Sequence, residues 1–401
     1  MTVQTTDLYS STGRTWGEAR YAAPLLGAIA AQAGDADRTR SVSKEVIAAL
    51  KANDIMRLSA SRELGGLEES MVQIGNELRA IAAACTSTGW CMWNHLCTFH
   101  HFVGLLGPEH REFLAGITRR HEWVCYPAGA STQIVSEQRG DETLLTGVAA
   151  FGSGARYADW AGVVFSTGQE NKGGFSMADL RHPGVRIEPT WEAMSVRASA
   201  TDHIHYDHVP VPTTRVAEVV PKYRFLHREA NFPMIHPRYR EDWVALSVLW
   251  LGTMATGVAD ASFEETALGI RERIAIYGTK MVERPTIHVN LGRAKALINA
   301  AHDTVFAALA ETDARIAAGV LPTEGDYFRQ TSAGMQAVLL CDEAMTLVLR
   351  VLGGNGLREG TDLERRYRDF QAMPLHINGH IDRITEQLGR LSLGLATQNP
   401  F

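Results

Sequence analysis

This 401-residue sequence has no long apolar runs, no excess of basic residues and only five cysteines. It contains no stretch of 18 consecutive apolar residues, so we expect no membrane contact. Its first residues lack a basic segment followed by an apolar one, which predicts a cytoplasmic protein. The formal net charge of −6 offers no positive field to phosphate backbones, which argues against nucleic-acid binding.

The five cysteines suggest neither a disulfide framework nor a metal site. An odd number of cysteines in a chain expected in the cytoplasm indicates reduced, buried thiols. Cys85, Cys91 and Cys97 recur every six residues in a helical stretch, which turns each about 120° around the axis from the last. They cannot share one ion, and we expect no metal.

The pattern of apolar residues divides the chain into three parts. From about Trp16 to Leu106 apolar residues recur at helical spacing. Between about 120 and 225 short β-rich runs alternate with Gly, Pro, Asn and Asp, and beyond about 242 long helical patterns return. We therefore predict an α+β, mainly α protein with three domains: helical (1–118), β (119–225) and a helical bundle (226–401).

The run ACTSTGWCMWNHLCTFHHF, residues 84–102, combines tryptophans and histidines on one predicted helix. At 100° per residue, Trp90, Asn94 and His101 share one stripe, and His95 lies on a neighbouring one. Imidazoles exchange protons near neutral pH, so His95, with His101 in reserve, is a candidate catalytic residue. Alternatively, these side chains only pack between helices.

Several runs resemble motifs of flavin-dependent hydroxylases in the acyl-CoA dehydrogenase superfamily. The segment ending at Trp90 resembles A-C-x-S-T-x-W, and TGVAAFGSGARYADW (146–160) resembles a strand pair that lies against the flavin. WEAMSVRASATDHIHYDHVPVP (191–212) resembles a loop that closes over the flavin edge. The run VLGGNGLREGTDLERRYRDFQAMPLHINGHID (351–382) resembles the superfamily signature ending in R-x-x-R-D, and it is the most specific of these matches.

The resemblance implies residues around the flavin ring. Trp90 and Ser153 are expected at the ring, with the Ser153 hydroxyl near flavin N5 and also a candidate for catalysis. Flanking glycines suit Ser153 because no Cβ atoms would hinder a close approach. Ser199 and Thr201 stand at the hydroxyl positions of the family's G-T-G-S motif and are expected flavin contacts. Arg197 is a further candidate, or else a structural anchor of the loop.

The resemblance also implies residues near the flavin phosphate, often across a subunit boundary. Arg271 and Arg273 in GIRERIAIYG (269–278) are the candidates, because a guanidinium matches two phosphate oxygens. On a helix they would lie about 200° apart, so only one can face the site, and we favour Arg273. Gly353 and Gly354 of the last run complete the expected cofactor contacts.

The end of the last run separates two branches of the superfamily. In the dehydrogenases the stretch after R-D leads to E-G-T, whose glutamate removes the α-proton of an acyl-CoA. This chain has Leu375, His376, Ile377 and Asn378 there and no glutamate, whereas the hydroxylases carry a histidine at the position of His376. We therefore predict that His376 is catalytic.

The resemblance as a whole implies the acyl-CoA dehydrogenase fold, with a central β-barrel and a C-terminal four-helix bundle, assembled as a homotetramer. It implies an oxygenase component that receives reduced FMN or FADH2 from a separate NAD(P)H:flavin reductase. With O2 this flavin would form a C4a-hydroperoxyflavin that hydroxylates a small aromatic or heteroaromatic substrate in a dry pocket. The alternatives are an FAD-dependent acyl-CoA dehydrogenase with its base elsewhere, an amine N-hydroxylase, and a non-catalytic flavin-binding scaffold.

Overall fold

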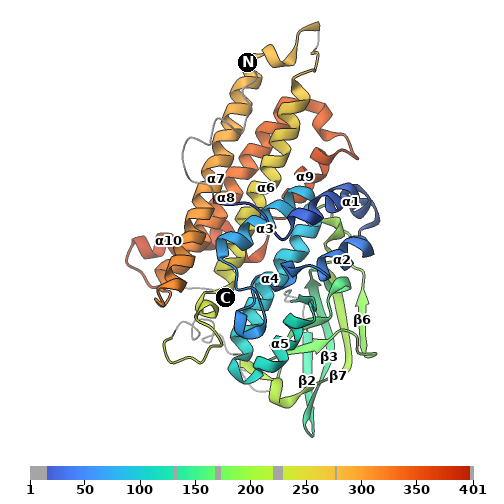
Figure 1. Ribbon diagram of the computed structural model, residues 1–401, viewed down its shortest axis with the longest axis vertical. Helices are drawn as coiled ribbons and strands as arrows, with labels where there is room; N and C mark the ends of the chain where they lie inside the picture. The colour runs from blue at the N-terminus through green and yellow to red at the C-terminus, as the bar shows by residue number, and fades with distance from the viewer. Residues whose placement is uncertain are drawn as a thin grey trace.

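The computed structural model describes residues 16–127, 129, 133–167, 173–219, 229–275 and 278–397. Helices come first along the chain, strands follow, and longer helices complete it (Figure 1). The first five helices are α1 (Leu26–Thr39), α2 (Lys44–Lys51), α3 (Met71–Ala84), α4 (Thr86–Leu106) and α5 (Arg111–Arg119). The last five are α6 (Trp243–Ile270), α7 (Pro285–Ala317), α8 (Glu324–Leu352), α9 (Asp362–Phe370) and α10 (Ile381–Ser392).

Several of these helices begin at a residue whose side chain accepts a hydrogen bond from the first turn. Ser70 caps α3 through Gln73 N, and Asp242 caps α6 through two backbone N–H groups. Thr323 forms a reciprocal capping box with Asp326 at the start of α8. Such caps satisfy N–H groups that have no partner inside the helix.

The strands form one curled sheet with the order β6-β7-β3-β2-β4-β5-β8, and β1 pairs with β4. They are β1 (Val124–Cys125), β2 (Gln133–Arg139), β3 (Glu142–Gly152), β4 (Trp160–Ser166), β5 (Gly173–Asp179), β6 (Val185–Glu188), β7 (Asp202–Pro212) and β8 (Ala217–Val219). This sheet is the expected barrel domain. The register between β3 and β7 shifts between Ala149 and Gly152, which turns the chain out of the sheet just before Ser153.

Helix α6 lies in the interior of the protein, enclosed by other helices. It is long and apolar enough to cross a membrane, but 89% of its most apolar window is buried inside the protein, where α3, α4, α7 and α8 surround it. A helix that is apolar all round is stable when it is enclosed on every side. One hydrophobic core joins the N-terminal helices to the bundle, so two of the three predicted domains share their interior.

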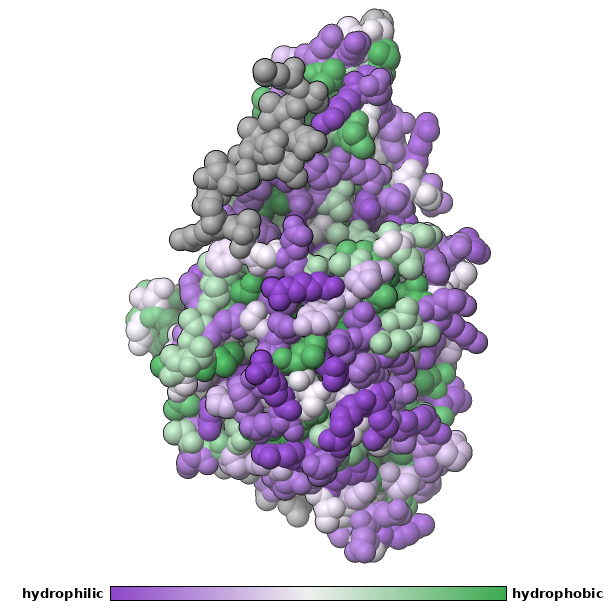
Figure 2. Space-filling model, viewed as in Figure 1, coloured by the Kyte–Doolittle hydropathy of each residue, from purple (hydrophilic) through white to green (hydrophobic). Residues whose placement is uncertain are grey.

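The visible outer surface combines polar and apolar residues. On the face in Figure 2, apolar side chains lie in small groups among charged and polar ones, and no large apolar area gathers over one element among the residues drawn in colour.

The crossing of α6 and α8 requires glycine and gives a stability prediction. A Cβ built at Gly334 would lie 2.3 Å from the carbonyl oxygen of Val248. Gly334→Ala should therefore separate the helices and lower the free energy of unfolding by about 1–3 kcal/mol. A Cβ built at Gly292 of α7 has no atom within 4 Å. Gly292→Ala should therefore raise the free energy of unfolding by about 0.5–1 kcal/mol. Denaturant unfolding measures both, and two shifts of the same sign would contradict the tight crossing.

Candidate active site

Four of the predicted flavin residues meet in one buried hydrogen-bonded row. The indole Nε1 of Trp90, on α4, donates to Ser153 Oγ over 3.1 Å. Ser153 Oγ lies 3.0 Å from Thr201 Oγ1, which lies 2.7 Å from Ser199 Oγ. The row joins α4 to the end of β3 and to the loop before β7. Each of these hydroxyls therefore has a fixed partner and a fixed place.

His376 also contacts Trp90. Its ring centroid is 5.5 Å from that of Trp90 and 4.8 Å from that of Trp93, in edge-on geometry. Its Nδ1 accepts a hydrogen bond from the backbone N–H of Asn378, so the neutral ring carries its proton on Nε2. Burial lowers the pKa of His376 to about 4. At neutral pH the imidazole is uncharged, and its Nε2–H has no partner among the described residues.

The support behind His376 was not predicted from the sequence. Asn378 Nδ2 donates to Ser247 Oγ over 3.1 Å, and Trp93 Nε1 donates to the Ser247 carbonyl oxygen over 2.9 Å. Ser247 is fully buried in α6. The available signal was a lone serine inside the apolar run WVALSVLWL. One polar residue of the core helix thus holds both an aromatic wall of the site and the turn that carries His376.

The loop that carries Ser199 is strained. Val196 has φ 41° and Ala200 has φ 48°, in the left-handed region that non-glycine residues rarely adopt. Hydrogen bonds hold it there: Gly154 N donates to Ser199 O over 2.8 Å, and Tyr157 Oη donates to Ala198 O over 3.1 Å. Ala200 stands where the family's G-T-G-S motif has its second glycine. It adopts the left-handed conformation typical of glycine, at a cost of about 1–2 kcal/mol.

The glycines around Ser153 have a role within the protein itself, and their closeness to a flavin ring stays a prediction. Gly154 has φ +79°, and a Cβ there would lie 3.3 Å from Trp123 Nε1. A Cβ on Gly152 would lie 3.3 Å from the carbonyl oxygen of Asp202. The turn requires glycine at 154, and tight packing within the protein disfavours a side chain at either position.

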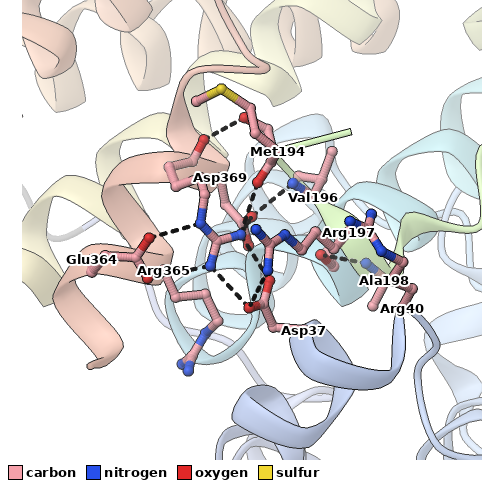
Figure 3. A network of polar contacts seen from close by, with 12 residues as sticks. Asp37, Arg40, Met194, Val196, Arg197, Ala198, Glu364, Arg365 and Asp369 are labelled. Atoms are coloured by element: carbon pink, nitrogen blue, oxygen red, sulfur yellow. Dashed lines mark hydrogen bonds and ion pairs between the residues drawn. The ribbon is translucent and has the colours of Figure 1, made fainter. Parts of the chain in front are cut away.

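Arg197 faces a network of charges shown in Figure 3. Its guanidinium lies 3.6 Å from Asp37 Oδ2 of α1, while its Nε is buried without a hydrogen-bond partner. The contact with Asp37 supports the alternative that Arg197 anchors the loop. Its contact with a flavin stays a prediction.

His95 was predicted to be catalytic, and its contacts do not support this. Its Nδ1 accepts from the backbone N–H of Val124 over 3.1 Å, and its Nε2 lies 3.0 Å from the carbonyl oxygen of Met56. Both ring nitrogens are thus occupied by backbone, and burial lowers the pKa of the ring to about 4. His95 joins α4 to β1 as a neutral structural residue, which is the packing alternative considered for this helix.

His101, the reserve candidate, belongs to a different aromatic group from His376. Its ring stacks on Trp243 at the start of α6, with centroids 4.4 Å apart, and lies 5.5 Å from the ring of Tyr126. Between these two groups on α4 lies Asn94, whose Oδ1 is buried without a hydrogen-bond partner. A buried carbonyl of this kind costs about 1–3 kcal/mol until a donor reaches it, so Asn94 is a further candidate for a ligand contact, one that was not predicted from the sequence.

The predicted phosphate-side residues lie at the opposite end of the bundle. α6 ends at Ile270, so Arg271 and Arg273 are not on a helix, and the prediction that they point 200° apart on one was wrong. From Ser247 to the end of α6 the helix rises by roughly 35 Å. Ile270 packs there against Val351 at the end of α8, which brings the following glycines, Gly353 and Gly354, to the same end.

This separation divides the predicted cofactor residues into two sets within one chain. The set at the β-domain is Trp90, Ser153, Arg197, Ser199 and Thr201, with His376 beside it. The set at the far end is Arg271, Arg273, Gly353 and Gly354. A single flavin cannot span roughly 35 Å, so both sets can serve one flavin only if two chains contribute. Over the described part of the chain, no group of three His, Cys, Asp or Glu residues could hold a metal ion.

Curated relatives match the chain along almost its whole length. A pigment production hydroxylase from a Rhodococcus species is 25% identical, with 94% of this chain and 96% of that protein covered. The flavin-dependent monooxygenase oxygenase subunit HsaA of Rhodococcus jostii is 25% identical, with 92% and 97% covered. The oxygenase component of p-hydroxyphenylacetate 3-hydroxylase of Acinetobacter baumannii is 23% identical, with 92% and 87% covered. Cyclohexane-1-carbonyl-CoA dehydrogenase of Geobacter metallireducens also matches, at 25% identity with 85% and 87% covered.

Solved structures and a family model agree on the fold. XiaF from a Streptomyces species, in complex with FADH2 and glycerol, superposes with a TM-score of 0.84 at 20% identity, covering 95% of this chain and 96% of that one. FMN-bound TdsC from a Paenibacillus species superposes with a TM-score of 0.82 at 18% identity, covering 95% and 98%. Residues 249–380 match the family "Acyl-CoA dehydrogenase, C-terminal domain". The chain therefore has the acyl-CoA dehydrogenase fold and is a distant relative of the oxygenase components of two-component flavin monooxygenases.

Proposed function

We propose that this protein is the oxygenase component of a two-component monooxygenase that uses reduced flavin and O2 to hydroxylate a small aromatic or heteroaromatic compound. The observation that carries the proposal is that His376 and Ser153 both contact Trp90. One indole thus joins a neutral imidazole to a row of hydroxyls. The names of the relatives, which specify hydroxylases and monooxygenases, support the same reaction class.

The residues present fit a planar ligand that forms hydrogen bonds. Ser153 Oγ, once it has bonded Trp90 and Thr201, retains capacity for a third hydrogen bond. Asn94 Oδ1 is an unpaired buried acceptor, and Arg197 Nε is an unpaired buried donor. Bound reduced flavin would supply the reaction with O2. The hydroxyl row would hold the flavin edge, and the tryptophans would exclude water.

His376 would hold a proton at the reacting oxygen by donating a hydrogen bond from Nε2–H. A neutral imidazole can donate this hydrogen bond without placing a fixed positive charge in the site. Because burial lowers its pKa to about 4, the ring stays neutral throughout the pH range of most enzymes. Asn378 and Ser247 hold the ring in place, since Asn378 N–H occupies Nδ1 and Asn378 Nδ2 donates to Ser247 Oγ.

The two distant sets of cofactor residues support an assembly in which chains share flavins. Arg273 or Arg271, together with Gly353 and Gly354, would approach the flavin of a neighbouring copy. Both arginines lack a carboxylate partner among the described residues and are available for phosphate, and a Cβ built at either glycine would meet open space. We propose a homotetramer, with a separate NAD(P)H:flavin reductase as the source of reduced FMN or FADH2.

An acyl-CoA dehydrogenase is the main alternative, because one such enzyme is among the matches. That reaction needs a carboxylate base beside the flavin. The position after the R-D motif carries His376, and no carboxylate stands between Leu375 and Asn378. The isolated protein distinguishes the two: a dehydrogenase retains coloured FAD, and the proposed oxygenase is a colourless protein that binds reduced flavin.

We expect no dehydrogenation of saturated acyl-CoA thioesters by the wild-type protein. The assay mixes protein, FAD, an acyl-CoA of short, medium or cyclic chain, and an artificial electron acceptor, and it follows acceptor reduction. Turnover at ordinary enzyme rates, on the order of 1 per second or faster, would contradict the proposed function. In parallel, flavin spectra recorded after reduced FMN or FADH2 meets oxygen with and without the protein test the oxygenase reaction directly.

A further inference from the structure

We infer that Asp369 is a positioning residue, whose buried carboxylate holds the strained loop bearing Ser199 and Thr201 in register with the turn bearing His376. Asp369 is the last acidic residue of α9 and is only 2% exposed. It touches none of the hydroxyls or rings of the site. The inference rests on the proposed function, since it gives Asp369 a role in the arrangement of that site.

Arg368 and Asp369 bind three consecutive loop residues. Arg368 donates to the carbonyl oxygen of Met194 over 2.8 Å and accepts, through its own carbonyl, from the hydroxyl of Ser195. Asp369 Oδ1 accepts from the backbone N–H of Val196 over 2.7 Å. Figure 3 shows the carboxylate facing this loop. Val196 is the first of the two strained residues, so the strain is held at its start by a charge-assisted hydrogen bond.

The same dipeptide is tied to the rest of the protein. Arg368 binds both oxygens of Asp37 on α1, over 2.8 and 2.9 Å, and reaches Glu364 one turn earlier on α9. Helix α1 thus becomes part of the frame around the loop, although no side chain of α1 was predicted to belong to the site.

On its other side Asp369 leads directly to His376. Its carbonyl accepts from the backbone N–H of Ala372, and the carbonyl of Phe370 accepts from Met373 N over 2.9 Å. The Met373 carbonyl then accepts from His376 N over 3.3 Å. Met373 is fully buried, so this series of turns cannot shift freely. Any displacement of Asp369 relative to Val196 therefore changes the spacing between His376 and the hydroxyl row.

The charges around Asp369 make this contact sensitive to protonation. Burial raises the pKa of Asp369 to about 7, against the opposing effect of Arg368. A protonated carboxyl is a weaker acceptor for Val196 N–H than a carboxylate. The charged or titratable groups around it are Arg365 and Arg368 of α9, Asp37 of α1, Cys85 between α3 and α4, and Arg197 of the loop.

The test compares Asp369→Asn with Glu364→Gln. Both changes are isosteric, and both remove a carboxylate beside Arg368, but Glu364 does not touch the loop. Reduced FMN and FADH2 are titrated anaerobically into each apoprotein and followed by tryptophan fluorescence. We expect Asp369→Asn to weaken binding about tenfold, as the loss of a charge-assisted hydrogen bond implies. Glu364→Gln should stay within about twofold of wild type, because Glu364 contacts Arg368 and does not touch the loop or the site.

A pH series separates positioning from general stability. The folded pKa of about 7 lies above the unfolded value of about 3.9, so the folded chain holds this proton more tightly. The contribution of Asp369 to stability is therefore lost as the pH rises from about 4 to about 7. The melting temperature of Asp369→Asn relative to wild type should rise over that window and level off above it. As the carboxylate ionises, wild type should lose stability but bind reduced flavin more tightly. In Asp369→Asn, the contribution of residue 369 to stability and to flavin binding should not depend on pH.

The outcomes distinguish two failures. If wild type binds neither reduced flavin, the proposed function fails. If wild type binds flavin and Asp369→Asn binds it equally well at every pH, the inference about Asp369 is overturned. Should Asp369→Asn not fold, Ser195→Ala removes one of the three loop contacts without touching a buried charge, and it should weaken binding about threefold to tenfold. Binding by that variant equal to wild type would then overturn the inference.

Discussion

Replacing His376 with alanine is expected to leave the binding of reduced flavin intact and to lower the yield of hydroxylated product about 10²–10⁴-fold, the usual effect of removing one positioned proton-transfer group. Oxygen would still be consumed, but hydrogen peroxide would replace the product. The reason lies in the fixed tautomer, since Asn378 N–H occupies Nδ1 and only Nε2–H is left to donate. The measurement is product and hydrogen peroxide formed per NADH, with the reductase and an aromatic compound that wild type hydroxylates.

His302 offers a matched control for His376. It is also a histidine whose pKa burial lowers to about 4, but it packs against Phe306 on α7, away from the site. His302→Ala should lower the melting temperature and leave the product-to-peroxide ratio unchanged. If His376→Ala behaves in the same way, with lower stability and unaltered coupling, then His376 only packs and has no place in the reaction.

Ser153→Val is expected to weaken reduced-flavin use or to shorten productive coupling by about ten- to a hundredfold without unfolding the protein. The change leaves Trp90 Nε1 without a partner, at about 1–3 kcal/mol when buried, and removes one of the two hydroxyl partners of Thr201, which keeps Ser199. It also places a branched side chain where the flavin ring would lie. Flavin titration and peroxide release together measure the effect.

Ser153→Ala separates the two causes, because it removes the hydroxyl without adding bulk. We expect an intermediate loss for this variant, and also for Ser153→Thr, which restores a hydroxyl but keeps the branched shape of valine. Turnover and coupling like wild type in Ser153→Val would mean that the residue is not at the flavin, and that the row of hydroxyls is only structural.

Local pattern was sufficient for the order of helices and strands. The apolar spacing of WVALSVLWLGTMATGVADASFEETALGI predicted α6, and the β-rich runs predicted β3, β4 and β7. Sequence motifs also identified Trp90, Ser153, Ser199 and Thr201 as one group, and the structure brings these four together. Such features depend on a few neighbouring residues, so periodicity and motif spacing record them.

The role of a side chain could not be predicted in this way where it depends on hydrogen bonds to backbone groups far away in the sequence. His95 and His376 look alike in the sequence, but Met56 and Val124 occupy both ring nitrogens of His95, while Nε2 of His376 stays open. Helical spacing also placed Arg271 and Arg273 on a helix that ends one residue earlier, because propensity does not fix where tertiary packing stops a helix.

The sequence alone was thus enough to establish the fold class, the missing glutamate and the row of hydroxyls. Only the tertiary structure decided which histidine has a free nitrogen, that Ser247 and Asn378 support it, and that Asp369 holds the loop. The physical reason is that a hydrogen-bond donor or acceptor is a property of the residue, whereas its availability depends on every group that folding brings within about 3 Å of it.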